Sequence, residues 1–317
     1  MPKILVSGAI NWDTILFVDR LPKPGEELKV RKVISVPGGK AANTAVAVAK
    51  ILGTDSVGII GMLGVDDIAE RQIKLLQEEG VDTSLIFRQK EMISGQAYVI
   101  VDNKGEDMIL THQAANLGIR PERVMQPEVL SAIDKSTTMV VIDPPLDIAG
   151  SLITTGRTTG KNVIWSPALL TNYGISGLQI YMTHVNYLIL NQQEARSLTS
   201  MEDGVQACIK ISNSIRGRNV VVTLGDGGCM ICTDGRSTMI PPMHLSSSAL
   251  KVVSTAGAGD TFVGAFAAFK LKGFQDVRAL HIANIAAALK TTREQTRASP
   301  TYDEIKRYTD DHSTVSM

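Results

Sequence analysis

The chain has 317 residues, of which 44% are hydrophobic, and its 32 Lys and Arg balance its 32 Asp and Glu. A neutral chain without a basic stripe argues against nucleic acid as a partner. No apolar run approaches the roughly 18 residues of a membrane span, so we expect no membrane partner. Three cysteines and the lack of a signal-peptide pattern predict free thiols and a cytoplasmic location.

Short, nearly continuous apolar runs alternate with helix-forming runs along most of the chain. Such runs are typical of parallel strands that are covered on both faces. The expected strands are residues 3–9, 56–62, 138–142, 162–165, 187–190, 219–224 and 228–233, and the expected helices are 41–52, 66–79, 146–155, 192–198, 205–215 and 262–271. The alternation predicts an α/β fold with a doubly wound, mostly parallel sheet sandwiched by helices.

Two segments, about 14–36 and 94–112, depart from this rhythm. Each holds a pair of alternating runs, which is the pattern of strands with one covered face. Together they predict a small antiparallel β lid that projects from the α/β body and excludes water from a site beneath it. The alternative is an ordinary surface excursion.

Polar side chains follow the first expected strand, at the edge where open α/β sheets bind ligands. Asn11 and Asp13 are two residues apart, so on extended backbone they point the same way. A glycine-rich segment, residues 37–43, then leads into a helix. Its glycines allow close approach of a substrate, and Lys40 and Asn43 offer donors to hydroxyls. Asp13 could instead cap a turn.

A second glycine-rich segment, Ser254 to Asp260, leads into the apolar run 262–271. The unpaired amides of a first helical turn, together with the helix dipole, form an anion site. A carboxylate beside it can take a proton from a hydroxyl while the amides hold the developing charge. The combination predicts phosphoryl or acyl transfer, and the alternative is a helix start with a favourable Asp in its first turn.

Cys229 and Cys232 form a C-x-x-C pattern within an expected strand. The period of two sends their sulfurs to opposite faces of the sheet. Redox pairs normally lie at a helix N-terminus, where the dipole lowers the thiol pKa. We therefore expect neither a redox nor a zinc role for these cysteines.

Four segments, in this order, resemble the signatures of the ribokinase family, the PfkB-type carbohydrate kinases. Residues 38–43 (GGKAAN) resemble G-G-K-G-A-N, and residues 254–260 (STAGAGD) resemble D-T-x-G-A-G-D. Between them, residues 191–194 (NQQE) resemble N-x-x-E, and 223–228 (TLGDGG) resemble T-L-G-x-x-G. The resemblance runs from about Lys3 to Lys306 and implies a single ribokinase-like kinase domain over 1–317.

The resemblance implies transfer of the ATP γ-phosphate to a primary hydroxyl of a sugar, with ribose as the expected acceptor. Asp260 would accept the hydroxyl proton, and the amides of Gly257, Ala258 and Gly259 would form the anion hole. Glu194 would organise Mg²⁺, although with Asn191 it also fits a helix capping box. The implied nucleotide-binding residues are Asn191, Thr223, Gly225, Gly228 and Asn284, and the implied sugar-binding residues are Asn11, Asp13, Gly39, Lys40, Asn43 and Asp143.

Several positions depart from the family pattern. Ser254 stands where ribokinases have an Asp that helps hold a monovalent cation, and residues 292–295 (TREQ) lack the glycine of T-R-x-G, so potassium activation is open. Asp143 stands where ribokinases usually have Glu, and Ala41 replaces a glycine of the first signature. A nucleoside kinase, another sugar kinase of the family and a non-catalytic sugar or nucleotide sensor remain alternatives. The exposed edges of the lid predict a homodimer through the lid.

Overall fold

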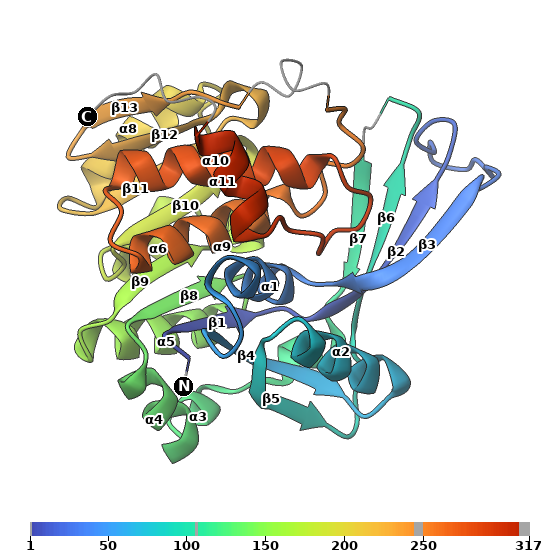
Figure 1. The fold of residues 1–317 in the computed structure, drawn as a ribbon, viewed down its shortest axis with the longest axis horizontal. Helices are drawn as coiled ribbons and strands as arrows, with labels where there is room; N and C mark the ends of the chain where they lie inside the picture. Colours follow the sequence, from blue (N-terminus) through green and yellow to red (C-terminus); the bar gives the residue numbers. More distant parts are fainter. Residues whose placement is uncertain (1, 105–106, 244–249, 311–317) are drawn as a thin grey trace.

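The structure is a computed structural model that describes residues 2–104, 107–243 and 250–310. Its main sheet runs through the body of the molecule (Figure 1). Its nine strands have the order β13-β12-β11-β10-β9-β8-β1-β4-β5. They are β1 (Ile4–Gly8), β4 (Val57–Gly64), β5 (Asp82–Gln89), β8 (Thr138–Ile142), β9 (Asn162–Ser166), β10 (Tyr187–Asn191), β11 (Asn219–Thr223), β12 (Cys229–Thr233) and β13 (Arg236–Ile240). All pairs from β5 to β11 are parallel, whereas β12 is antiparallel to both of its neighbours.

Helices cover both faces of this sheet, which explains why its strands are apolar throughout. One face carries α1 (Lys40–Leu52), α2 (Asp67–Glu78), α9 (Ala258–Leu271), α10 (Asp276–Thr291) and α11 (Tyr302–Asp310). The other carries α3 (Pro121–Val124), α4 (Pro127–Lys135), α5 (Leu146–Thr158), α6 (Gly174–Met182), α7 (Gln192–Thr199) and α8 (Gly204–Ser214). The predicted doubly wound α/β sandwich is confirmed. Among the described residues, no helix combines the length and apolarity needed to cross a membrane.

The alternation of side chains across the sheet places residues of one strand in two separate cores. In β1, Ile4 and Val6 pack on one face and Leu5 on the other. In β12, Cys229 lies in the first core and Cys232 in the second. The two sulfurs of the C-x-x-C pattern therefore lie on opposite faces, as the period of a strand predicted.

A second sheet of four strands projects from the body beside α1 and α2 (Figure 1). Its strands are β2 (Asn11–Phe17), β3 (Lys32–Gly38), β6 (Gly95–Val101) and β7 (Asp107–His112), in the order β3-β2-β6-β7. The hairpin pairs β2/β3 and β6/β7 are antiparallel, and the central pair β2/β6 is parallel. The small sheet predicted for the lid is confirmed, although residues 105–106 of the expected segment lie outside the described residues. Its role in excluding water stays a prediction.

The strands of the lid begin and end at other residues than the sequence indicated. β2 starts at Asn11, before the expected segment 14–36 begins, and β3 starts only at Lys32 near the end of that segment. Asn11 and Asp13 thus belong to the lid sheet. Both are buried on the same face of β2, as their spacing predicted.

Candidate active site

A cavity of about 200 Å³ lies where the carboxyl ends of four parallel strands meet the lid. Its wall includes the last residue of each strand, namely Ile142 of β8, Ser166 of β9, Asn191 of β10 and Thr223 of β11. The lid contributes residues of β2, β6 and β7, and the first turn of α9 closes the floor. This edge, where the strand order reverses at β1 and β8, is the usual ligand site of an open α/β sheet.

Of the residues predicted to form the anion hole, Gly257 and Gly259 line the cavity, whereas Ala258 is not among the lining residues and its amide donates to the Thr255 carbonyl at 3.1 Å. The first turn of α9 also presents a carboxylate to the cavity. Asp260 lies in that turn, and its Oδ2 accepts a hydrogen bond of 2.8 Å from Nδ2 of Asn43. The hydroxyl of Thr44 donates to the backbone carbonyl of Asp260 at 3.3 Å. Asn43 and Thr44 belong to the first turn and a half of α1, so two helix starts that are far apart in sequence share one site.

Small side chains explain why α1 and α9 approach so closely. Ala41, Ala42 and Ala45 of α1 are fully buried. At Gly264 of α9, a side chain would overlap the Thr44 carbonyl and Ala47. The close packing of the two backbones therefore positions Asn43 against Asp260.

Gly257 is the N-cap residue of α9 and has a φ of 81°. Its backbone lies against the carbonyl group of Thr296, and a Cβ at this position would overlap that oxygen. A left-handed φ and a filled space behind the backbone both require glycine. The backbone amides at this helix start are thereby fixed in direction, which is what an anion hole needs.

Four carboxylates surround one ammonium in and beside the cavity. Nζ of Lys40 lies 3.8 Å from Oδ2 of Asp143. Burial lowers the pKa of Lys40, but Asp143, Asp260, Glu194 and Asp13 together raise it above its ordinary value. Burial raises the pKa of Asp260, Glu194 and Asp143, and the charge of Lys40 opposes each of these shifts.

Asp13 is fixed by the neighbouring strand β3 and by the loop between α10 and α11. The Thr296 hydroxyl donates to Oδ2 of Asp13 at 3.0 Å, and the carboxylate packs against Gly38, where a side chain would overlap it. Burial raises the pKa of Asp13 to about 6, although Thr296, Arg297 and Lys40 oppose the shift. Beside it, Oδ1 of Asn11 accepts a hydrogen bond of 2.8 Å from Nδ2 of Asn116.

Thr296 and Arg297 are site residues that sequence reasoning missed. Arg297 is 5% exposed, and its Nη2 donates to the Gly38 carbonyl at 2.7 Å and to Oε1 of Gln72 at 2.8 Å. Burial lowers the pKa of this guanidinium to about 10. The sequence holds two Thr-Arg pairs, at 292–293 and 296–297, and only the first was compared with the T-R-x-G pattern. The sequence alone does not show which of the two pairs reaches the site.

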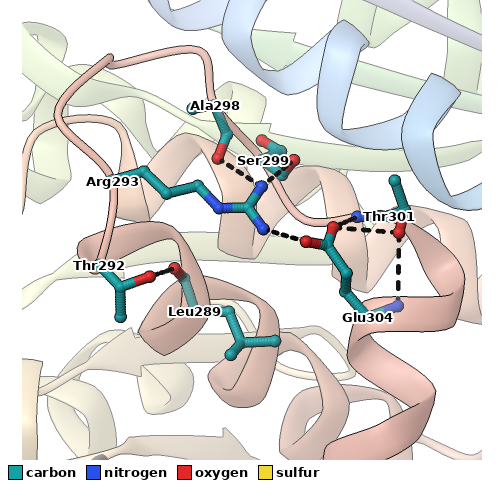
Figure 2. Close-up of polar contacts among 7 residues, drawn as sticks. All are labelled: Leu289, Thr292, Arg293, Ala298, Ser299, Thr301 and Glu304. Carbon is teal, nitrogen blue, oxygen red and sulfur yellow. Dashed lines mark hydrogen bonds and ion pairs between the residues drawn. The ribbon is translucent and has the colours of Figure 1, made fainter. Parts of the chain in front are cut away.

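The loop that carries these two residues joins α10 to α11 and is braced by Arg293, as Figure 2 shows. Nη1 of Arg293 donates to the carbonyls of Ala298 and Ser299 at 3.3 and 3.0 Å, and Nη2 contacts Glu304 at 2.5 Å. Glu304 also accepts from the amide and hydroxyl of Thr301 at the start of α11. The loop is therefore held closed against the helix ends.

Asn191 and Glu194 form the capping box that was the alternative interpretation of this motif. Oδ1 of Asn191 accepts from the Glu194 amide at 2.8 Å, and Oε2 of Glu194 accepts from the Asn191 amide at 2.9 Å. Both residues nevertheless line the cavity, as does Thr223 at the end of β11. Asn191 and Glu194 therefore cap α7 and also line the cavity.

The structure brings together most, but not all, of the residues predicted from the sequence. Asn11, Asp13, Gly39, Lys40, Asn43, Asn191, Glu194, Thr223, Gly257, Gly259 and Asp260 line the cavity. Asp143 lies just outside it, beside Lys40. Gly225 and Gly228 flank it on the turn between β11 and β12, and Nδ2 of Asn284 donates to the Pro241 carbonyl at 3.0 Å. The nucleotide role of these last three residues stays a prediction.

Comparison with known proteins supports the same class of enzyme. The family model of pfkB family carbohydrate kinases matches residues 1–302. The ATP-dependent ribose-1-phosphate kinase of Halopiger xanaduensis is 29% identical over 308 residues, 97% of this chain and 98% of that protein. The ribokinase of Staphylococcus aureus is 27% identical over 316 residues, 96% and 99% of the two chains. The structure of Arabidopsis thaliana ribokinase with ribose and ATP is 25% identical with a TM-score of 0.81, and the match covers 96% of this chain and 98% of that one.

The chain belongs to the PfkB family of carbohydrate kinases, and its fold, the glycine-rich start of α9 and the carboxylate-lined cavity agree with this class. It is an ATP-dependent sugar kinase whose relatives include ribokinases. The resemblance seen in the four sequence signatures is thus confirmed over almost the whole chain.

Proposed function

We propose that this kinase transfers the γ-phosphate of ATP to the primary hydroxyl of ribose. The observation that carries the proposal is the pairing of Asp260 with the start of α9 in a cavity that also holds Asn11, Asp13 and Lys40. The sugar oxygen forms a bond to the γ-phosphorus, the bond to ADP breaks, and Asp260 takes the hydroxyl proton. The amides of Gly257 and Gly259 would face the charge on the transferred group, whereas the predicted third donor, Ala258, gives its amide to the Thr255 carbonyl. Three buried free thiols fit our expectation of a reducing cytoplasm.

The nucleotide would bind along the ends of β10 and β11. Thr223 and Asn191 line that part of the cavity, and the turn at Gly225 is open to close approach because no atom lies within 4 Å of its missing side chain. Gly228 and Asn284 both contact the backbone at Ile240 and Pro241. They would therefore contribute to nucleotide binding by holding the segment after β13 in place beside the turn at Gly225.

Mg²⁺ fits the same side of the cavity. The described residues contain no cluster of three or more His, Cys, Asp or Glu that would cage a metal. Mg²⁺ is usually bound through one or two carboxylates, several waters and the substrate phosphates, and Glu194 supplies such a carboxylate. When bound with ATP, the ion would neutralise phosphate charge, while Glu194 fixes its water shell.

The charges in the cavity favour an uncharged acceptor. Lys40 is the only Lys or Arg among the described residues that line it, whereas Asp13, Glu194 and Asp260 are all lining residues. A phosphorylated acceptor such as ribose 1-phosphate would bring a second anion to a site with a single ammonium that is already shared. Ribose supplies only hydroxyls, for which Asn11, Asp13 and Asn43 are suitable partners.

Initial rates of ADP formation with ribose, deoxyribose, fructose, ribose 1-phosphate and inosine test the choice of acceptor. We expect the highest kcat/KM for ribose. A higher value for inosine would reassign the enzyme as a nucleoside kinase, and a higher value for ribose 1-phosphate would contradict the charge argument. Nucleotide binding without turnover of any acceptor would favour the sensor alternative.

Acceptor affinity is expected to depend on pH through Asp13. Above a pH of about 6 its carboxylate is ionised and accepts hydroxyl protons, and below that pH it is protonated and loses acceptor capacity. The Kd of ribose should therefore rise as pH falls through 6, by up to about tenfold per pH unit. Calorimetric titration in the presence of ADP measures this directly. Asp13→Asn should bind ribose weakly with no such dependence, and an equal slope in wild type and variant would contradict the role.

We also propose that the protein forms a homodimer through the lid. β7 is an edge strand whose residues are all exposed, including Met108 at 40% and Leu110 at 55%. An exposed apolar edge favours pairing with a second copy. Light scattering should give a dimer for wild type and a monomer for Leu110→Lys. Met239→Lys, a change of a 51% exposed residue on the edge strand of the main sheet, should leave the dimer intact. A wild-type monomer would contradict the proposal.

A further inference from the structure

Lys290 is a fully buried lysine in the last turn of α10, directly behind the candidate anion hole. Its exposed fraction is 0%, and it ranks with the largest fully buried side chains of the described chain. Its Nζ donates to two backbone carbonyls, that of Ser254 at 3.4 Å and that of Arg293 at 3.2 Å. The Ser254 carbonyl lies on the loop that leads into α9 and precedes Gly257. The Arg293 carbonyl lies at the start of the loop between α10 and α11, and Thr296 of that loop packs against Gly257.

The charge of this ammonium is held without a carboxylate in contact. Among the described residues, no ion pair within 4.0 Å includes Lys290. Burial lowers the pKa of Lys290 to about 8, and the more distant charge of Asp260 raises it. A buried charge with only dipoles around it is costly, so a packing role would be served better by an apolar side chain.

The two loops that Lys290 joins are those in which the chain departs from its family. Ser254 replaces the Asp that in ribokinases helps hold a monovalent cation, and Gln295 stands where the family has glycine. The residues present do not fit such a cation, because the carbonyl of Ser254 already accepts from an ammonium and no carboxylate replaces the missing Asp at this position. A protein ammonium thus already binds backbone carbonyls of both loops.

We propose that the Lys290 ammonium is a built-in cation that ties the loop into α9 to the loop behind Gly257, so that catalysis needs no added monovalent cation. Lys290 is a positioning residue, since it acts through the Ser254 and Arg293 carbonyls and not on the reacting atoms. Only the kinetic tests of this inference rest on the proposed kinase function.

The kinetic test compares potassium chloride with choline chloride at equal ionic strength. Wild type should show the same kcat in both salts within about twofold, a difference of about 0.4 kcal/mol. Lys290→Met fills the same space without the charge, and its kcat should fall by about 10²-fold, the effect of a small misplacement at a reacting centre. Its Tm should stay level or rise, because an unpaired buried charge has been removed. If Lys290 had only a structural role, Lys290→Met would instead lower Tm and leave kcat unchanged.

Two further variants complete the kinetic test. Lys290→Ala opens space for a small cation, and ethylammonium or potassium, but not choline, should restore part of its kcat. Lys270→Met is the matched control, since Lys270 lies at the far end of α9 and pairs with Asp276. Its kcat should be that of wild type. A wild-type kcat stimulated tenfold by potassium, or a Lys290→Met kcat equal to wild type, would overturn the inference and leave the proposed kinase function standing.

A second readout does not depend on the acceptor. Hydrogen exchange followed by mass spectrometry should show faster exchange of peptides that span 254–260 in Lys290→Met than in wild type or Lys270→Met. Unchanged exchange in these peptides would overturn the inference even if no acceptor were turned over. Faster exchange with no turnover of any acceptor by wild type would support the inference and contradict the proposed function.

Discussion

Asp260→Asn is expected to lower kcat by about 10²–10⁴-fold while ATP and ribose still bind. The amide keeps the size of the carboxylate but cannot take the hydroxyl proton. Burial raises the pKa of Asp260 above its ordinary value, so the carboxylate is a stronger base than one in water. The measurement is the steady-state rate at saturating substrates, together with calorimetric binding of a non-hydrolysable ATP analogue.

Asp67→Asn is the matched control for this change. Asp67 is an exposed carboxylate in the first turn of α2, where it interacts with the helix dipole but with no cavity. If Asp260 only stabilised its helix, both variants would lose up to about 1 kcal/mol of unfolding free energy and neither would lose activity. A kcat for Asp260→Asn within tenfold of wild type would contradict its role as base.

Gly257→Ala is expected to lower kcat by about 10²–10³-fold, the usual effect of losing one donor from an anion hole. A methyl group at this position overlaps the Thr296 carbonyl, and the φ of 81° is strained for alanine. The start of α9 must therefore shift, and the amides lose their direction toward the phosphoryl group. Thr296 would move as well, so the KM for the sugar should rise through Asp13.

Gly273→Ala separates backbone strain from displacement of the site. Gly273 follows the other end of α9 with a φ of 87°, and a methyl group there meets no atom within 4 Å. It should cost about 1 kcal/mol of stability and leave kcat unchanged. Equal kinetic losses in the two variants would show that strain in α9 alone is responsible and that Gly257 has no special role.

The parts of the fold that follow from local pattern were predicted closely. β8 spans residues 138–142 as expected, and α1, α7 and β12 lie within one residue of their predicted bounds. These segments are buried on both sides or begin at a strong cap, so their own residues decide their structure. The glycine-rich starts of α1 and α9 were found because glycines that precede a helix-forming run are also a local pattern.

The residues that the sequence did not reveal depend on contacts between distant parts of the chain. Thr296 reaches Asp13 across 283 positions, and Arg297 reaches Gly38 across 259. The parallel pairing of β2 with β6 likewise joins separate segments, and it extends β2 back to Asn11. Nothing in the run 289–291 distinguished Lys290 from a surface lysine, because only its burial and its carbonyl partners give it a role.

In the proposed reaction, the γ-phosphate passes to the primary hydroxyl of ribose, with Asp260 as base. The most direct test is phosphorus NMR of the products formed from ATP, Mg²⁺ and ribose, for wild type and Asp260→Asn. We predict a sugar phosphate whose phosphorus couples to the two protons of C5, formed by wild type and almost absent with the variant. A phosphate on any other carbon, a product formed equally by the variant, or no sugar phosphate at all would contradict the account.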